Sequence, residues 1–406
     1  MPAKGADKVR DPAPTPARDI PPGATNAAPG DATPNATPRA TPPGVAPATP
    51  PGVAPTPALR KPSRKTREGF PVVVFLLFAA ITLVVFVLCV AAGSVGVPLE
   101  DTLDIIMRAV TGTEQTDTTA ASIILASRLP RVVCVALVGA ALALCGCAMQ
   151  GLLKNPLADG STLGVSSGAA LGAVIAIAFG VTIPVLPFAG TVVMAIGFAF
   201  LSLLLIVSLA YKLDYSLSTN TIILIGVVFA MFASSILQLV ITFSKTHVAE
   251  ISFWLMGSLA GSTYGNALML AVALVIGGSL LVGNARELNA FALGEDNARH
   301  VGVNVGRVKL IVLVAVSVLI GVSVSVGGAI GFVGLVTPHM LRMIVGPNHW
   351  RLMPASLFGG ACFLMLADLV ARVLLSPLEL RLGIVTSFVG AILFVYIFYT
   401  TRKVRA

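Results

Sequence analysis

The chain has little charge. Of its 406 residues, 11% are Asp, Glu, Lys or Arg, and 56% are hydrophobic. A soluble globular domain carries roughly 25% charged residues, so the composition excludes an ordinary soluble protein of this length. The formal net charge is +9, yet the basic residues are not clustered on a soluble module, which argues against a nucleic-acid partner. Long apolar runs recur from Phe70 to Thr400 and predict an all-α polytopic membrane protein.

Groups that carry enzyme chemistry are also scarce. No Gly-x-x-x-x-Gly-Lys-[Ser/Thr] sequence occurs, so the chain has no P-loop to hold ATP phosphates. The four histidines show no ligand-like spacing, and no Ser/His/Asp grouping has a supporting fold context. The sequence therefore predicts no catalytic residue, no metal site and no cofactor of its own.

The cysteines do not indicate a disulfide framework. Their number is odd, all lie in apolar runs, and Cys145 and Cys147 point to nearly opposite sides of a helix. We interpret them as small packing residues. The five are Cys89, Cys134, Cys145, Cys147 and Cys362.

Residues 1–69 differ sharply from the rest. They hold 17 of the 27 prolines, and an octamer beginning at Thr41 is repeated, with one change, from Thr49. Such a segment has too little apolar surface to offset the entropy of ordering, so we expect a disordered Pro/Ala/Thr-rich cytoplasmic arm. A recognition role for the proline repeats is the alternative. The membrane domain is expected at residues 70–402.

About ten transmembrane helices can be placed in that domain, because a helix needs about 20 residues to cross the hydrocarbon core. The third and eighth are short or interrupted by Gly or Pro. The expected spans are 70–92, 132–152, 163–181, 185–211, 220–243, 265–283, 307–327, 329–346, 353–375 and 383–400.

The basic residues predict the orientation. Five of them precede the first span, which places the N-terminus inside, and ten crossings return the C-terminus to the same side. Sixteen basic residues then lie in inside segments and six in outside ones, as the positive-inside rule requires. Arg128 and Arg131 oppose this bias. Either they snorkel to lipid headgroups or they form a basic docking point for an external partner.

Two further features bear on packing and on the source of energy. The glycines at 164, 168 and 172, and those at 328, 331 and 334, allow helix backbones to approach closely. Charge inside the spans is sparse, and Asp368 and Arg372, four residues apart, are expected to pair. An ion-coupled secondary transporter normally needs isolated ionisable residues in several spans, so their near-absence weakens that interpretation and implies that the driving energy comes from elsewhere.

The loop from Asn284 to Gly302 is too long for a minimal turn. We expect Asn289 to cap a helical turn, and a second short helix between Gly294 and Gly302, with Leu293, Ala298 and Val301 on one side. Such a helix on the cytoplasmic surface suits docking of a soluble partner. A simple interfacial helix is the alternative.

Several motifs, taken together, resemble the permease of ferric-siderophore, haem and vitamin B12 ABC importers, the FecCD type. The likeness extends over roughly residues 70–402, and the arm lies outside it. The motifs are Ser127-Arg-Leu-Pro-Arg131, Asn155-Pro-Leu-Ala158, Leu163-Gly-Val-Ser-Ser-Gly-Ala169, Leu293-Gly-Glu295, Gly328-Ala-Ile-Gly-Phe-Val-Gly-Leu335, Pro338-His339, Ala367-Asp-Leu-Val-Ala-Arg372 and Glu379-Leu380.

The resemblance implies a set of partners. Two copies of a separate ATPase would bind ATP, an extracytoplasmic binding protein would deliver the cargo, and a second permease copy, identical or a close paralogue, would complete the pathway. It also implies residue roles. ATPase coupling falls to Leu293, Gly294, Glu295, Ala298 and Gly302, docking of the binding protein to Arg128, Arg131 and Arg372, and the cytoplasmic gate to Ser218, Thr219 and Asn220. Helix capping is the other role expected of residues 218–220, and the two roles do not exclude one another.

The chain departs from the family pattern near the last span. Where the family often has Pro-Val/Ile-Gly after Glu-Leu, the chain reads Glu379-Leu-Arg-Leu-Gly383, and where it often has Gly-x-Pro, the chain reads Gly390-Ala-Ile392. Arg381 adds a charge on the expected outer side, and the sequence does not indicate its partner. From the resemblance as a whole, the expected function is a multi-pass cell-membrane permease subunit of an ABC importer. A ferric siderophore is the first choice of cargo, with haem and cobalamin next. The alternatives are an ion-coupled secondary transporter that works alone and a membrane scaffold or sensor.

Overall fold

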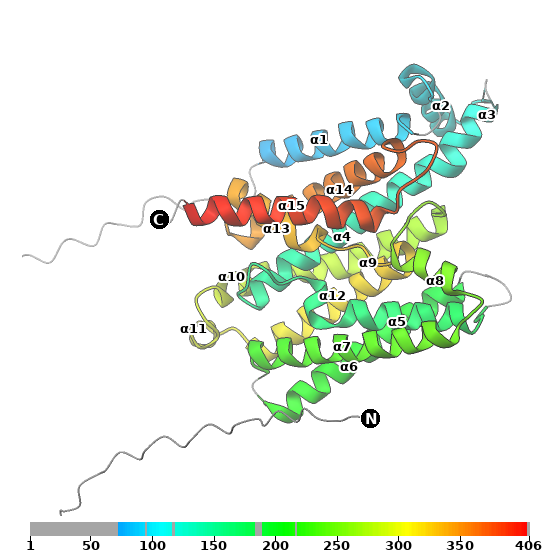
Figure 1. The fold of residues 1–406 in the computed structure, drawn as a ribbon. Helices are drawn as coiled ribbons and strands as arrows, with labels where there is room; N and C mark the ends of the chain where they lie inside the picture. Colours follow the sequence, from blue (N-terminus) through cyan, green and yellow to red (C-terminus); the bar gives the residue numbers. More distant parts are fainter. Residues whose placement is uncertain (1–71, 94–95, 116–117, 183–188, 216, 404–406) are drawn as a thin grey trace, which may run out of the picture. The chain divides into compact units, whose positions relative to one another are not determined.

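The computed structural model describes residues 72–403, apart from residues 94–95, 116–117, 183–188 and 216. Within these ranges the chain forms α-helices joined by short connections, with no β-strand (Figure 1). The predicted arm, residues 1–69, lies outside the described residues.

The helices are named in chain order as in Figure 1. Their bounds are α1 (Val72–Ala91), α2 (Leu99–Thr111), α3 (Thr118–Ser122), η1 (Ile123–Arg128), α4 (Leu129–Leu152), η2 (Gly160–Leu163), α5 (Val165–Ala178), α6 (Ala189–Leu213), α7 (Thr219–Phe243), α8 (Val248–Leu255), α9 (Tyr264–Gly283), α10 (Ala285–Phe291), α11 (Glu295–His300), α12 (Val305–Gly327), α13 (Val333–Val345), α14 (His349–Val373) and α15 (Leu382–Lys403).

The predicted spans are present as helices. In the described part of the chain, seven are long and apolar enough to cross a membrane: α1, the run that ends in α4, α6, α7, α9, α12 and α14. The shorter apolar helices α5 and α13, and the stretch Leu382–Ile397 of α15, match the other three predicted spans. The expectation that the third and eighth spans are short is confirmed, since α5 has 14 residues and α13 has 13.

The second span was predicted too short. A continuous helical run extends from Thr119 to Leu152, 34 residues, whereas hydropathy placed its start at residue 132. In the sequence Arg128 and Arg131 limit the apolar run on its N-terminal side. Both side chains are buried, however, and the helix continues through them back to Thr119. Pro130 also fits, because it lies in the first turn of α4, where a missing N–H costs little.

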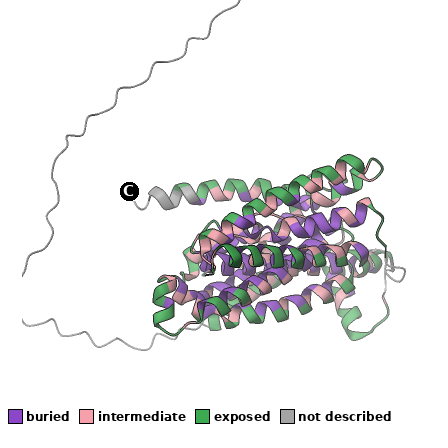
Figure 2. Cartoon of the chain, turned by 90° about the horizontal axis from the view of Figure 1, so that it is seen from below, coloured by how far each residue is buried: buried purple, intermediate pink, exposed green. Residues whose placement is uncertain are grey.

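The core lies along a few inner helices. In the most apolar 18-residue stretch of the α4 run 78% of residues are buried, and in that of α12 72%, against 6% in α1. Figure 2 shows the same division, with buried residues along the inner helices and exposed ones along the outer ones. In a membrane, lipid chains are as apolar as the side chains, so close backbone packing must hold the inner helices together.

Glycines permit that packing. A Cβ on Gly146 of α4 would overlap the carbonyl of Gly334 on α13, and one on Gly139 would overlap the carbonyl of Gly360 on α14. The predicted close approach at residues 164–172 is confirmed, because a Cβ on Gly172 would overlap a backbone carbonyl of α6. These pairs explain why α4 packs directly on α13 and α14.

Candidate functional site

Three buried arginines meet at the end of the bundle where α4 begins. Arg131 binds Asp368 through Nη2 at 2.9 Å and Glu379 through Nη1 at 2.8 Å. The predicted pair of Asp368 and Arg372 is confirmed, with Nε 2.9 Å from Oδ2. Asp368 is completely buried between the two guanidinium groups. We call Arg131, Asp368, Arg372 and Glu379 the Asp368 cluster.

The same arginines hold the end of α1. Arg128 Nη1 donates to the carbonyl of Ala91 at 2.8 Å, and Arg372 donates to the carbonyls of Cys89 and Ala92, each at 2.9 Å. All three guanidinium groups are therefore engaged within the chain. These bonds do not test whether the three arginines dock a binding protein, so that role stays a prediction.

Arg381 extends this region. The sequence placed its charge on the outside without naming a partner. In the structure its guanidinium carbon lies 4.6 Å from the centre of the Phe253 ring, at the end of α8. This cation–π contact was missed because α8, only eight residues long, gave no span signal of its own.

The opposite end of the bundle carries the loop between α9 and α12. It contains two short helices, α10 and α11, as the pattern predicted. Gly294 and Gly302 adopt φ values of 106° and 88°, which favour glycine, and they bracket α11 as expected. The residues predicted to couple to the ATPase, Leu293, Gly294, Glu295, Ala298 and Gly302, therefore lie in or beside α11, and the coupling role itself stays a prediction.

Two details of this loop were predicted wrongly. Asn289 does not cap a helix: it lies within α10 and its Oδ1 accepts from the backbone N–H of His349 at 2.8 Å. The expected apolar face of α11 is divided. Ala298 is fully buried, whereas Leu293 and Val301 are 70% and 69% exposed. The exposed pair leaves apolar surface at the tip of this loop.

The predicted gate residues begin α7. Ser218 is the N-cap, and its Oγ accepts from the N–H of Thr221 at 3.4 Å, which confirms the capping role considered from the sequence. Asp214 accepts from the N–H of Ser218 at 3.1 Å. Asn220 is exposed. The Thr219 hydroxyl takes no part in this capping and instead donates to Glu295 Oε1 at 3.1 Å.

The contact between Thr219 and Glu295 joins the predicted gate to the predicted coupling segment. Sequence reasoning missed the third participant, Lys309 of α12. Its side chain is 1% exposed, and its Nζ lies 2.8 Å from Glu295 Oε2 and 2.7 Å from the carbonyl oxygen of Leu217. The signal in the sequence is a lysine at the start of an apolar span, but the positive-inside rule accounts for such a residue equally well, so the pattern does not single it out.

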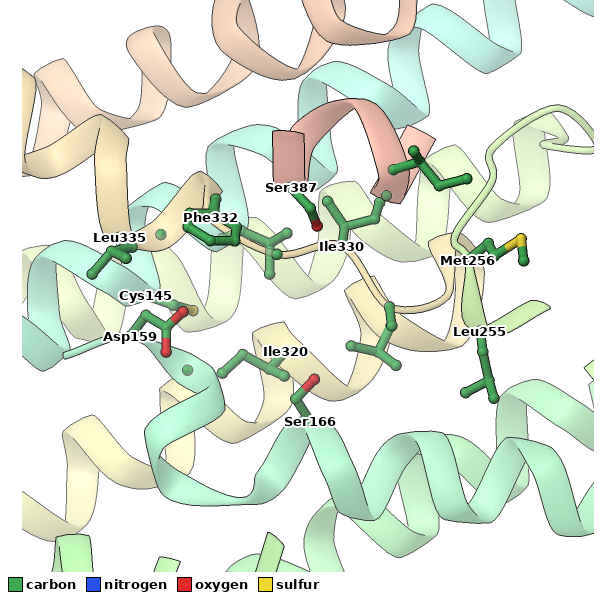
Figure 3. A pocket seen from close by; sticks show the side chains of 18 of the residues that line it. Cys145, Asp159, Ser166, Leu255, Met256, Ile320, Ile330, Phe332, Leu335 and Ser387 are labelled. Carbon is green, nitrogen blue, oxygen red and sulfur yellow. The ribbon is translucent and has the colours of Figure 1, made fainter. Parts of the chain in front are cut away.

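A cavity of about 970 Å³ lies between α4, α5, α12, α13 and α15. Figure 3 shows Asp159, Ser166 and Ser387 approaching it from three separate elements. Most of its wall is apolar, as at Ile320 and Phe332, and none of the described residues that line it is basic. The sequence did not predict these lining residues, because they come from segments distant along the chain.

The described residues contain no group of three or more His, Cys, Asp or Glu side chains that is placed to hold a metal ion. All five cysteines are unpaired and four are buried, as their interpretation as packing residues requires.

Comparison with known proteins shows which family the helical part of the chain matches. The model of the FecCD transport family matches residues 81–400. An uncharacterized ABC transporter permease, YvrB of Bacillus subtilis, is 41% identical over 66% of this chain and 76% of its own length. The cobalamin import permease BtuC of Halobacterium salinarum is 39% identical over 69% of this chain and 73% of its own.

Two further relatives bear on function. The hemin transport permease HmuU of Yersinia pestis is 36% identical, and the match covers 69% of this chain and 84% of HmuU. A solved structure described as an inward-facing, metal-chelate type ABC transporter superimposes with a TM-score of 0.72 at 31% identity. That match covers 81% of this chain and all of the other.

Proposed function

This chain belongs to the FecCD transport family, and from that membership we propose that it is the permease of an ATP-driven importer for a metal chelate. The observation that carries the proposal is the family match over residues 81–400, which omits only the first half of α1 and the last residues of α15 among the ten helices matched to predicted spans. It is supported by relatives named for cobalamin and hemin import and by the metal-chelate transporter of similar structure.

A ferric siderophore is the proposed cargo, with haem and cobalamin next. A relative named for molybdate import is 34% identical, so identity alone does not separate a bulky chelate from a small oxyanion. The cavity favours the chelate. Its lining includes the carboxylate of Asp159 and, among the described residues, no basic side chain, which is a poor environment for a free oxyanion.

The proposed mechanism assigns ATP hydrolysis to two copies of a separate ATPase. The coupling residues Leu293, Gly294, Glu295, Ala298 and Gly302 would contact it, and the exposed side chains at 293 and 301 offer apolar surface for that contact. Both termini are proposed to be cytoplasmic, which places α11 inside. Thr219 and its neighbours would then form the gate beside it.

On the outer side, a binding protein would deliver the cargo. We propose that it docks through acidic groups near Arg128, Arg131 and Arg372. A second permease copy would complete the pathway. Because the delivery protein selects the cargo, the permease needs only weak contacts, and the mostly apolar cavity suits such a path.

Reconstitution tests the proposal. The chain is purified with its ATPase and binding protein, placed in liposomes, and supplied with a ferric hydroxamate, hemin or cyanocobalamin. We expect uptake of one of these that requires ATP on the ATPase side and stops when the ATPase is inactivated by substitution. Uptake that follows a proton gradient and is unaffected by ATP would refute the proposal in favour of an ion-coupled transporter.

A further inference from the structure

The cluster around Lys309 joins three segments that are far apart in the sequence. Lys309 is on α12, Glu295 is the first residue of α11, and Leu217 and Thr219 lie where the connection from α6 enters α7. Glu295 uses both carboxylate oxygens, Oε2 toward Lys309 at 2.8 Å and Oε1 toward Thr219 at 3.1 Å. We call these four residues the Lys309 cluster.

Breaking a single contact of this cluster is energetically costly, because it leaves a buried charge without compensation. The Lys309 side chain is 1% exposed, and a buried ammonium group is tolerated only when partners compensate its lost hydration. Its bonds to Glu295 and to the Leu217 carbonyl supply that compensation. If α11 moved away from α12, the ammonium group would lose its counter-charge, so movement of α11 must carry the neighbouring groups with it.

The backbone of the α6–α7 connection depends on the same bond. Leu217 has a φ of 49°, in the left-handed region that side chains other than glycine seldom adopt. Its N–H donates to the Asp214 carbonyl at 2.9 Å, and its own carbonyl accepts from Lys309. The entry to α7 is therefore held in an uncommon conformation by a residue of α12.

We propose that Lys309 and Glu295 transmit movement of α11 to the entry of α7, with Thr219 as the receiving residue. The inference rests on the proposed function, since it takes α11 as the ATPase contact and residues 218–220 as the gate. Lys309 is then a positioning residue: it touches neither cargo nor nucleotide, and it keeps α11 and the gate moving as one unit.

The experiment uses the full complex of permease and ATPase in lipid nanodiscs. Asn220 is exposed, so an Asn220→Cys substitution reports on the gate through its reaction with a charged maleimide. The native cysteines are buried or half-buried in apolar helices, and the chain without the substitution gives their background. ATP should change the labelling rate at residue 220 in the otherwise unsubstituted chain.

We expect K309M to leave ATP hydrolysis within about twofold but to reduce the ATP-dependent change in labelling about tenfold. E295Q should reduce the change in labelling by a similar factor. T219V should reduce it less, because both charges remain, and T219S should restore it. K309R, which keeps the charge, should retain the response. The matched control is R307M, which removes an exposed basic residue from the same turn of α12.

The double variant E295Q/K309M separates coupling from mere stability. E295Q alone leaves a buried ammonium group without its counter-charge, so its thermal unfolding temperature should fall, and removing that charge as well should restore it. The labelling response should stay lost in the double variant. If the double variant regains both properties, the cluster is only structural and the inference is wrong.

The other outcomes are equally decisive. If K309M responds to ATP as R307M does, the inference fails while the proposed function stands. If K309M does not assemble, T219V decides, and an unaltered response in T219V overturns the inference. If the chain that carries only Asn220→Cys neither binds the ATPase nor changes its labelling with ATP, the proposed function fails, and the inference with it.

Discussion

The Asp368 cluster makes replacement of Asp368 by asparagine a severe test of how charge is tolerated in this bundle. Asp368 is completely buried and serves two arginines. Arg131 donates to Oδ1 from Nε at 3.1 Å and from Nη2 at 2.9 Å, and Arg372 Nε lies 2.9 Å from Oδ2. Asparagine keeps one acceptor oxygen but removes the charge, so both guanidinium groups lose their shared counter-ion.

The magnitude follows from burial. Breaking a buried ion pair by removing one partner costs about 3–5 kcal/mol, because the remaining charge is left uncompensated. Arg131 keeps Glu379, at 2.8 Å, so the loss falls mainly on Arg372, whose other bonds go to backbone carbonyls of α1. We therefore expect D368N to lower the free energy of unfolding by about 3 kcal/mol, the lower end of that range.

Unfolding in mixed micelles titrated with SDS measures this loss. The first control is E379Q, because the Glu379 side chain is 36% exposed and its loss should cost about 1 kcal/mol. The second is D104N, which breaks the exposed pair with Arg108 and should cost at most about 1 kcal/mol. If D368N is no more destabilising than E379Q, the reasoning about the buried cluster is refuted.

Three further predictions concern packing, the loop and the cavity. G146A should destabilise the protein by about 1–3 kcal/mol, because the new Cβ overlaps the Gly334 carbonyl. G197A is the control, since the space around Gly197 is open and the protein should keep its stability. Unfolding titrated with SDS compares the two variants. N289A removes the bonds to the Asn348 side chain and the His349 backbone, so amide hydrogens of α10 should exchange faster, and unchanged exchange would contradict the role assigned to Asn289. S387W fills the cavity and should reduce uptake at least about tenfold with ATP hydrolysis retained; S279W, on an exposed position of α9, is its control, and equal uptake by both would remove the cavity from the pathway.

Much of the architecture could be read from the sequence. Apolar runs are a local property of the chain, so each of the ten predicted spans coincides with an apolar helix. Short-range features were found equally well, such as the capping of α7 by Ser218, the pair Asp368–Arg372 four residues apart, and the short helix between Gly294 and Gly302. Each depends on residues within one or two helical turns.

Hydropathy failed where a polar residue is satisfied by a distant one. Arg128 and Arg131 ended the predicted span, yet the helix continues through them because carbonyls of α1 and carboxylates of α14 and of the segment after it compensate the charge. Asn289 was predicted to cap its own helix because its bonds to residues of α14 cannot be seen from neighbours in the chain.

The sequence by itself determined that the chain spans a membrane, where most of its helices lie, and which family it resembles, because apolar length and motif order are written along the chain. Only the tertiary structure decided which charges pair between segments distant along the chain, which glycines meet and how Lys309 joins α11 to the entry of α7. In a low-dielectric interior, each polar group must find its partner wherever the packed backbones bring one close. That pairing depends on distances in space, which no local pattern contains.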